Sequence, residues 1–231
     1  MSRFVDELWA TGEPYWRRVV AHDFMRGLCD GGLDPATFRH YLVQDVLFLE
    51  EHARTLALIA ARCPDGGVFA MLADHAQGVF GLVRGLFAEA LGGAPWRGAA
   101  GLSPTNLLYV SWCRRWAYEG TALEALGAVL PVYWQYGRLG HELRSRGSSE
   151  PTYAAWIARY GGEGFDAGVL APVLAAVDSL AAEAGAEARR RARANFAAGS
   201  RFELMFWDAV LAREGWPYDD GGPGAVAAAG S

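Results

Sequence analysis

Lysine is absent from this 231-residue sequence, so all 21 basic side chains are arginines. That absence excludes chemistry that needs a lysine amine, including a Schiff base, a P-loop phosphate clamp and a lysine general base. An excess of positive charge is absent too, because 26 acidic residues outnumber the arginines and the net charge is −5. This balance argues against nucleic acid or an anionic membrane as the main partner.

Cysteine and long apolar runs are also scarce. Cys29, Cys63 and Cys113 are far apart and form no CxxC motif, which indicates neither a structural zinc site nor a disulfide framework. The longest uncharged stretch, residues 98–113, contains serine, proline, threonine and asparagine and is too short and polar to cross a bilayer. Because the sequence opens with charged residues and no apolar signal segment, we expect a cytoplasmic protein.

Apolar residues are plentiful and follow a helical period. They make up 52% of the chain, with 20% charged residues, which is typical of a globular protein with one sizeable core. Proline after Asp34 and after Ser103, and a capping box at Thr121, predict helix starts. We predict an all-α single domain over residues 1–217 and a disordered tail over 218–231. The predicted helices are 35–62, 68–91, a segment from 104, a segment from 121, 151–161 and 167–214 with a break near Gly185.

One acid, Asp45, lies on a helix face that should be buried. Tyr41 precedes it by one turn, Phe48 follows it by nearly one turn, and Phe38 and His52 extend the same stripe. A buried acid must be paired or hydrogen-bonded to be retained. Asp45 is therefore either a ligand-binding carboxylate or a structural acid paired with a neighbouring arginine.

A second acid, Glu203, shares its helix face with Gly199 and Phe206. The absence of a side chain at Gly199, one turn earlier, predicts room for a molecule to approach the carboxyl group. Burial raises the pKa of such a group, which suits general acid–base catalysis near neutral pH. The structural alternative is a buried ion pair with Arg201 or Arg159.

Tyrosines accompany these acids at Tyr109, Tyr136 and Tyr160. Aromatic stripes are usually core, but a buried tyrosine hydroxyl needs a hydrogen-bond partner. Several tyrosines beside two buried acids favour a flat aromatic ligand that forms hydrogen bonds. A metal site is disfavoured, because Glu51 and His52 are adjacent and point about 100° apart on a helix.

Seven motifs occur in an order that resembles one family, the TenA/thiaminase II family. They are FRHYLVQD (38–45), DHAQG (74–78), SPTNLLY (103–109), LPVYWQY (130–136), WIARYGG (156–162), FELMFW (202–207) and REGW (213–216). The resemblance covers nearly the whole chain, from about Phe4 to Tyr218. It implies a haem-oxygenase-like helical bundle, a homotetramer, an aminopyrimidine as the small-molecule partner, and no metal or organic cofactor.

The resemblance also implies roles for individual residues. Glu203 falls on the family's catalytic glutamate, and Tyr160 on the tyrosine that forms a hydrogen bond near that acid. Asp45 falls where the family contacts the aminopyrimidine. The remaining implied substrate-binding positions are Phe48, Tyr109, Val132, Tyr136 and Phe206.

Two of these positions depart from the thiaminase pattern. Val132 stands where thiaminases carry a cysteine nucleophile, and Phe48 replaces a pocket tyrosine. The chain therefore resembles the branch without the active-site cysteine. That branch is associated with hydrolysis of aminomethyl- or formylaminomethyl-pyrimidine to hydroxymethyl-pyrimidine in thiamin salvage, with water as nucleophile.

Other functions fit the same motifs. Loss of the cysteine favours a protein that binds aminopyrimidines without chemistry, whereas retention of Glu203 opposes it. A metal-dependent oxidase shares the fold, and a haem oxygenase would need a proximal histidine, for which His22 is the candidate. Cys113, one turn after Tyr109, is expected to be a core thiol rather than a relocated nucleophile.

Overall fold

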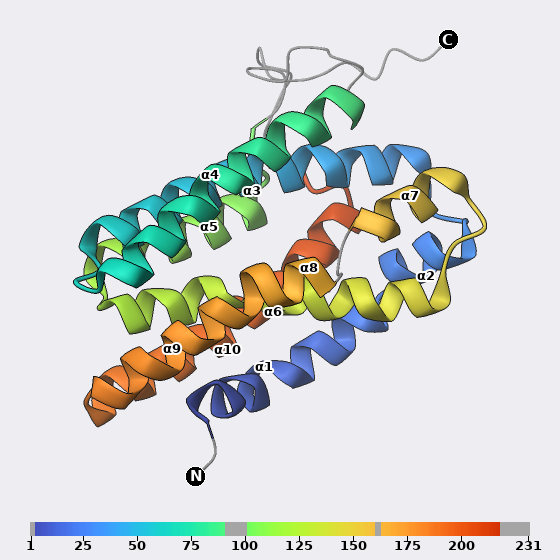
Figure 1. Ribbon diagram of the computed structural model, residues 1–231. Helices are drawn as coiled ribbons and strands as arrows, with labels where there is room; N and C mark the ends of the chain where they lie inside the picture. Colours follow the sequence, from blue (N-terminus) through green and yellow to red (C-terminus); the bar gives the residue numbers. More distant parts are fainter. Residues whose placement is uncertain (1–2, 91–100, 160–162, 218–231) are drawn as a thin grey trace.

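The computed structural model describes residues 3–90, 101–159 and 163–217 and, across these ranges, contains helices and no strand (Figure 1). The predicted all-α class is therefore confirmed for the described chain. The elements are α1 (Phe4–Val20), α2 (Asp23–Asp30), α3 (Pro35–Arg62), α4 (Gly66–Ala90), α5 (Pro104–Glu119), α6 (Ala122–Arg146), α7 (Pro151–Arg159), α8 (Glu163–Phe165), the π-helix η1 (Asp166–Leu170), α9 (Ala171–Glu183) and α10 (Ala186–Leu211).

The helix starts follow the capping signals of the sequence. The Asp34 side chain accepts a hydrogen bond from the backbone N–H of Ala36 at the start of α3. Ser103 caps α5 in the same way, and Thr121 forms the predicted capping box with Glu124 at the start of α6. These bonds satisfy backbone N–H groups that a helix leaves free at its first turn.

The segment before α10 differs from the predicted single helix. The break near Gly185 is confirmed, because α9 ends at Glu183 and α10 begins at Ala186. The predicted start near 167 falls instead in the π-helix that joins α8 to α9. The predicted tail, residues 218–231, lies outside the described residues. Within the described chain, no helix combines the length and apolarity needed to cross a membrane.

Helix α6 runs through the centre of the molecule and packs along α10, while α3 packs along α4 and α1 along α10 (Figure 1). Two glycines allow α6 and α10 to approach closely. A Cβ at Gly127 would lie 2.5 Å from the carbonyl oxygen of Ala192, and one at Gly199 would lie 2.8 Å from that of Ala128. The space predicted for a ligand at Gly199 is therefore filled by α6, and that prediction is wrong.

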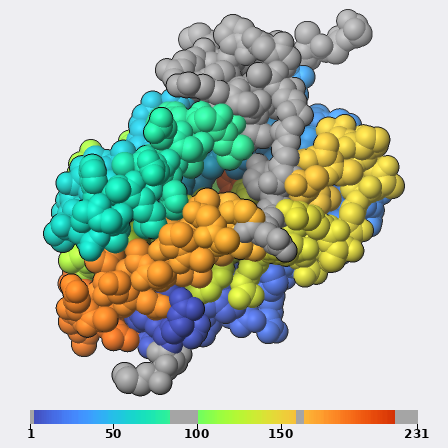
Figure 2. Space-filling view, viewed as in Figure 1, coloured from blue at the N-terminus to red at the C-terminus, as the bar shows by residue number. Residues whose placement is uncertain are grey.

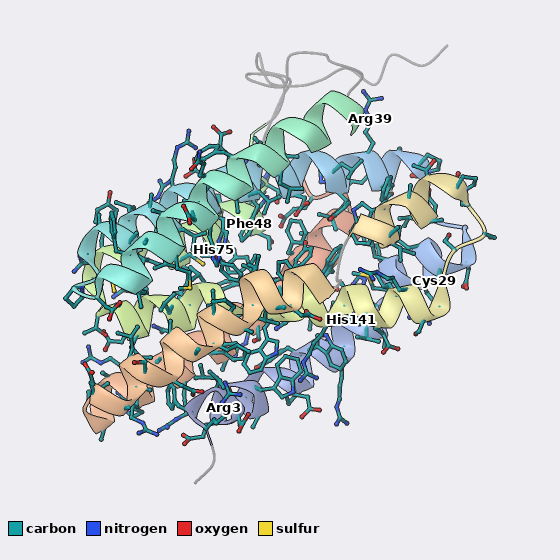
Figure 3. The ribbon with its side chains drawn as sticks, in the orientation of Figure 1. Arg3, Cys29, Arg39, Phe48, His75 and His141 are labelled. Atoms are coloured by element: carbon teal, nitrogen blue, oxygen red, sulfur yellow. The ribbon has the colours of Figure 1, made fainter. Side chains whose placement is uncertain are left out.

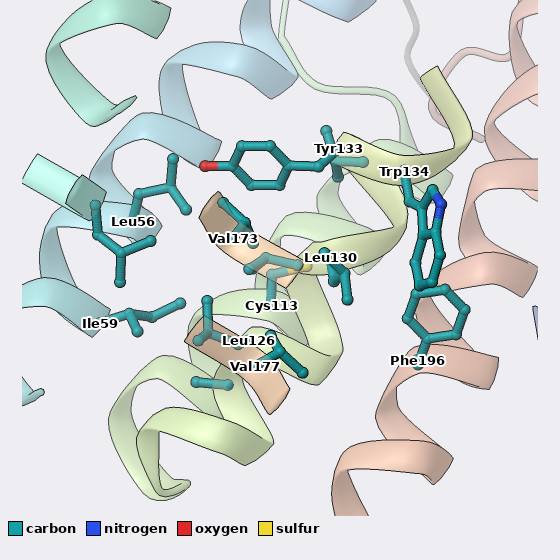
Figure 4. Packing of buried hydrophobic residues seen from close by; sticks show 14 of the residues in the cluster. Leu56, Ile59, Cys113, Leu126, Leu130, Tyr133, Trp134, Val173, Val177 and Phe196 are labelled. Atoms are coloured by element: carbon teal, nitrogen blue, oxygen red, sulfur yellow. The ribbon is translucent and has the colours of Figure 1, made fainter. Parts of the chain in front are cut away.

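Two large hydrophobic clusters and a small third one, which contains Val46 and Val83, form the core of the described chain. In the largest one, Leu126 and Leu130 of α6 meet Val173 and Val177 of α9 (Figure 4). The second cluster surrounds Tyr41, whose ring stacks on Trp207 at 5.3 Å between centroids. Phe48 and Tyr133 belong to the first cluster, and Tyr136 to the margin of the second. The cavity described next lies where these clusters meet.

Candidate active site

A cavity of about 480 Å³ lies between α3, α4, α6 and the α8–η1 segment. Figure 2 shows the surface hollowed between α4, in teal, and the orange helical segment that begins at α8. Phe48 and His75 lie between these elements in Figure 3. The lining is mostly apolar and comprises Asp45, Phe48, Leu49, His52, Asp74, His75, Gly78, Val79, Leu82, Val132, Tyr133, Tyr136, Gly137, Phe165 and Val169.

Asp45 is the buried carboxylate on the cavity wall, where Asp74 is exposed. It is only 3% exposed, and the hydroxyls of Tyr41 and Tyr136 donate to its two oxygens, each at 3.3 Å. Tyr41 is one turn earlier on α3, while Tyr136 comes from α6. The predicted burial of Asp45 is confirmed, and hydrogen bonds from tyrosine hydroxyls stabilise the buried carboxylate. A carboxylate oriented in this way can accept hydrogen bonds from a ligand amine.

Glu203, the other acid singled out from the sequence, is also buried, 2% exposed on α10. The Tyr109 hydroxyl donates to its Oε1 at 2.9 Å. Burial, opposed by that hydrogen bond and reinforced by the negative charge of Asp45, raises the pKa of Glu203 to about 8. The carboxyl group therefore holds its proton at neutral pH and can donate it.

Glu203, Tyr109 and Phe206 lie in a layer behind the cavity lining. Phe48, which does line the cavity, has its ring centroid 4.9 Å from that of Tyr109 and 6.3 Å from that of Phe206. The structure thus brings Asp45, Phe48, Val132 and Tyr136 to the wall and places the other three behind it. Tyr160, the predicted partner of the catalytic acid, lies outside the described residues.

The ion-pair alternative with Arg201 is wrong. Arg201 is exposed and donates to the Tyr15 hydroxyl at 3.2 Å, whereas Glu203 is hydrogen-bonded to Tyr109. The side chain of Arg159 is outside the described part of the structure. Glu203 is thus a buried acid hydrogen-bonded to a neutral tyrosine, which leaves its proton available.

Three polar side chains at the other end of the cavity had no assigned role from the sequence. His52 and Tyr133 are buried, and His75 is half-buried. The Tyr133 hydroxyl is 3.3 Å from Nδ1 of His75, and the ring centroids of His52 and Tyr133 are 5.7 Å apart. The helical spacing of His52 from Asp45 predicts that both lie on the same face of α3. The packing of α4 and α6 against that face, which places His75 and Tyr133 near His52, is seen only in the structure.

Cys113 lies in the core outside the cavity lining. Its Sγ approaches the carbonyl oxygen of Ala128 at 3.7 Å, and burial raises the pKa of the thiol far above its ordinary range. A nucleophile must be a thiolate, so this environment opposes the relocated-nucleophile alternative. The aliphatic Val132 instead occupies the cavity wall.

The metal and haem alternatives would each need suitably placed ligands. Among the described side chains, no group of three or more His, Cys, Asp or Glu is arranged to hold a metal ion. His22 uses Nδ1 to accept from the backbone N–H of Phe24 at the start of α2, and its Nε2 pairs with Asp208. Both ring nitrogens of the haem-ligand candidate are thus engaged.

The bundle with an internal polar-ended cavity is a haem-oxygenase-like fold. A domain of unknown function with that fold from Shewanella denitrificans superposes with a TM-score of 0.71 at 14% identity, over 90% of this chain and 92% of the other. A TenA homologue from Pyrococcus furiosus superposes with a TM-score of 0.82 at 24% identity, over 90% and 99% respectively. The predicted fold is confirmed.

The chain belongs to the TENA/THI-4/PQQC family, whose model matches residues 9–213. It is 32% identical over 218 residues to the aminopyrimidine aminohydrolase of Bacillus subtilis, covering 93% of this chain and 92% of that protein. The family resemblance inferred from the motifs is confirmed.

Proposed function

We propose that this protein is an aminopyrimidine hydrolase of thiamin salvage, converting an aminomethyl- or formylaminomethyl-pyrimidine to hydroxymethyl-pyrimidine. The observation that carries the proposal is the pairing of two buried acids, Asp45 on the cavity wall and Glu203 behind the lining, where burial raises the pKa of Glu203 to about 8. The similarity to a relative named aminopyrimidine aminohydrolase supports the same reaction. For the free amine, water adds to the methylene carbon, the carbon–nitrogen bond breaks, and ammonia leaves.

Asp45 and Tyr136 form the binding end of the proposed site. An aminopyrimidine presents N–H donors on its exocyclic amine, and the Asp45 oxygens accept such donors. Tyr41 and Tyr136 hold the carboxylate in place from two helices. Phe48 and Tyr136 supply aromatic surface against which the flat ring packs.

Glu203 is the proposed proton donor. It would deliver a proton to the ring or leaving amine and later accept one from water, with Tyr160 as the partner that the family resemblance implies. Glu203 is not among the residues that line the cavity, so the substrate and this side chain must approach each other on binding. Catalytic hydrogen bonds are often long in ligand-free structures and shorten in the complex.

Water is the proposed nucleophile because Val132 has no group that can attack. This residue supports placing the chain in the branch without the active-site cysteine, in which thiamin cleavage itself is not the expected reaction. We further propose a cytoplasmic homotetramer, as the family resemblance implies. Light scattering after size-exclusion chromatography measures the oligomer directly, and a monomer would contradict that assignment.

The second candidate function is aminopyrimidine binding without chemistry. The observation that favours it is that Glu203 lies behind the lining, while Val132 removes the nucleophile. Incubation with thiamin, aminomethyl-pyrimidine and its formyl derivative separates the two. Formation of hydroxymethyl-pyrimidine supports hydrolysis, whereas tight calorimetric binding with no product supports the binding function. Metal analysis of the purified protein tests the remaining oxidase alternative.

A further inference from the structure

The attacking water of the proposed reaction must lose a proton as its oxygen bonds to the methylene carbon. Glu203 cannot take that proton at the same moment, because its raised pKa, about 8, keeps it protonated at neutral pH and its own proton goes to the leaving amine. A general base must lie within hydrogen-bond reach of the water, which requires a place on the cavity lining. His75, from the DHAQG motif of the sequence, lies on that lining.

Three other lining residues could accept a proton, and each is less suited than His75. Asp45 accepts hydrogen bonds from two tyrosine hydroxyls and is the proposed binding group. Asp74 is exposed, and a carboxylate in contact with solvent is a weaker base than an imidazole. Burial, with a smaller contribution from His75, lowers the pKa of His52 to about 4, so this imidazole is also a weak base at neutral pH.

His75 has the geometry of an oriented imidazole base. It is half-buried on α4, and its Nδ1 is 3.3 Å from the hydroxyl of Tyr133 on α6. Its Nε2 forms no hydrogen bond within the described residues. In the tautomer with the proton on Nδ1, that N–H donates to Tyr133 and Nε2 is free to accept. Partial burial lowers the pKa of His75 from 6.5, opposed by the charge of Asp74, so the ring is neutral at pH 7.

The length of the cavity fits a water between the substrate and His75. On α3, His52 lies seven residues after Asp45, about 10 Å along the helix axis. On α6, Tyr136 bonds Asp45, while Tyr133 faces His52 and His75, so both walls have the same order. A pyrimidine ring held at Asp45, followed by a water with contacts of about 3 Å on either side, fills that length.

We propose that His75 is the general base of the hydrolysis and that Tyr133 positions its ring. This inference rests on the proposed function and adds a residue to its mechanism. Nε2 of His75 takes a proton from water as the water oxygen bonds to the methylene carbon. The electron pair of the broken carbon–nitrogen bond goes to the leaving nitrogen, which receives the proton of Glu203. His75 then returns its proton to Glu203 through solvent in the cavity, and both groups regain their starting states.

The experiment measures kcat/KM across pH, together with the calorimetric Kd, for aminomethyl-pyrimidine. His75→Gln should lower kcat by about 10²–10⁴-fold, the usual contribution of a positioned base, and change Kd less than about threefold. Wild-type activity should fall below neutral pH as His75 becomes protonated, and this acid limb should be absent from His75→Gln. His40→Gln is the matched control, because His40 is partly buried with a lowered pKa but lies outside the cavity lining.

Two further variants identify the group that gives the acid limb. The groups that face His75 are Asp74 on its own helix, His52 on α3 and Tyr133 on α6; Phe165 and Val169, from the α8–η1 segment of the lining, carry no charge. Asp74→Asn removes a charge that raises the pKa of His75, so the limb should move to lower pH. Tyr133→Phe should lower kcat about threefold to tenfold, as loss of a neutral hydrogen bond does, with Kd unchanged.

Rescue by an added base separates lost chemistry from a lost contact. His75→Ala leaves space for free imidazole, which should restore turnover in proportion to its unprotonated concentration, and that result supports the inference. Wild-type turnover in His75→Gln overturns it, as does a parallel loss of kcat and affinity without rescue, which would make His75 structural. If wild-type protein hydrolyses no aminopyrimidine, the proposed function fails and the inference with it, whereas an active wild type with an indifferent His75 overturns the inference alone.

Discussion

Asp45 and Glu203 are two carboxyl groups with nearly the same burial and different surroundings. Both accept hydrogen bonds from tyrosine hydroxyls. Asp45 lines the cavity, while Glu203 lies behind the lining and has a pKa raised to about 8. The charge of Asp45 is one cause of that rise. Two equally buried carboxyl groups can therefore have different roles. Asp45, on the cavity wall, is placed to bind a ligand, whereas Glu203, behind the wall, is placed to keep a proton for transfer.

The largest expected effect is on turnover and comes from replacing Glu203, the proposed proton donor. Glu203→Gln should lower turnover by about 10²–10⁴-fold, the usual contribution of a positioned acid or base, while Kd changes less than about tenfold. Glutamine can still accept from Tyr109 but cannot exchange a proton. Steady-state kinetics with calorimetry measures both. Glu214→Gln is the control, since that carboxylate caps α5 through Thr105. Wild-type turnover in Glu203→Gln would make Glu203 structural.

The same substitution should change how stability depends on pH. The pKa of Glu203 is raised from 4.5 to about 8 on folding, so the unfolded chain loses this proton at lower pH than the folded protein. The stabilising contribution is full below about pH 4.5 and is lost as pH rises through about 8. Relative to wild type, Glu203→Gln should gain stability over this window, by about 1.4 kcal/mol per pKa unit. Urea unfolding at both ends of the window checks this, and a constant difference contradicts the raised pKa.

Replacing Asp45, the proposed substrate-binding carboxylate, is expected to have a smaller effect. Asp45→Asn should weaken aminopyrimidine binding by about 1.5–3 kcal/mol, the range for hydrogen bonds to a charged group. Asparagine replaces one of two acceptors with a donor. Calorimetry measures the loss, with Asp178→Asn as control because Asp178 pairs with Arg3 at the start of α1. Unchanged affinity would assign Asp45 a purely structural role.

Much of the architecture followed from local chemistry in the sequence. Caps at Asp34, Ser103 and Thr121 fixed helix starts because each satisfies free backbone N–H groups. The spacing along α3 correctly placed Asp45 and His52 on one buried face. These are contacts between residues close in the chain, for which periodicity and capping are informative.

Contacts between helices that are distant in the sequence could not be predicted from capping and periodicity. Gly199 was expected to leave room for a ligand, but α6 fills that space with Ala128 and Pro131. The sequence also could not show that Phe48 lines the cavity while Glu203 does not. Likewise, the meeting of His75 with Tyr133 depends on how α4 and α6 pack. Helix periodicity identifies a buried face but does not tell which neighbour covers it.

The smallest expected effect on catalysis comes from replacing Cys113, which we expect to be inert although it lies near Glu203 and Tyr109. Cys113 lies one turn after Tyr109 on α5, and burial, with a smaller contribution from Glu203, raises the pKa of its thiol. Its thiol is fully buried against the Ala128 carbonyl, and no thiolate is available there at neutral pH. Cys113→Ala should therefore keep hydrolysis within about twofold of wild type and lower stability by about 1 kcal/mol, as is typical of a point substitution. Kinetics and urea unfolding on the same preparation measure both quantities. A hundredfold loss of turnover with intact binding would instead make the reaction nucleophilic, with Cys113 rather than water attacking the substrate.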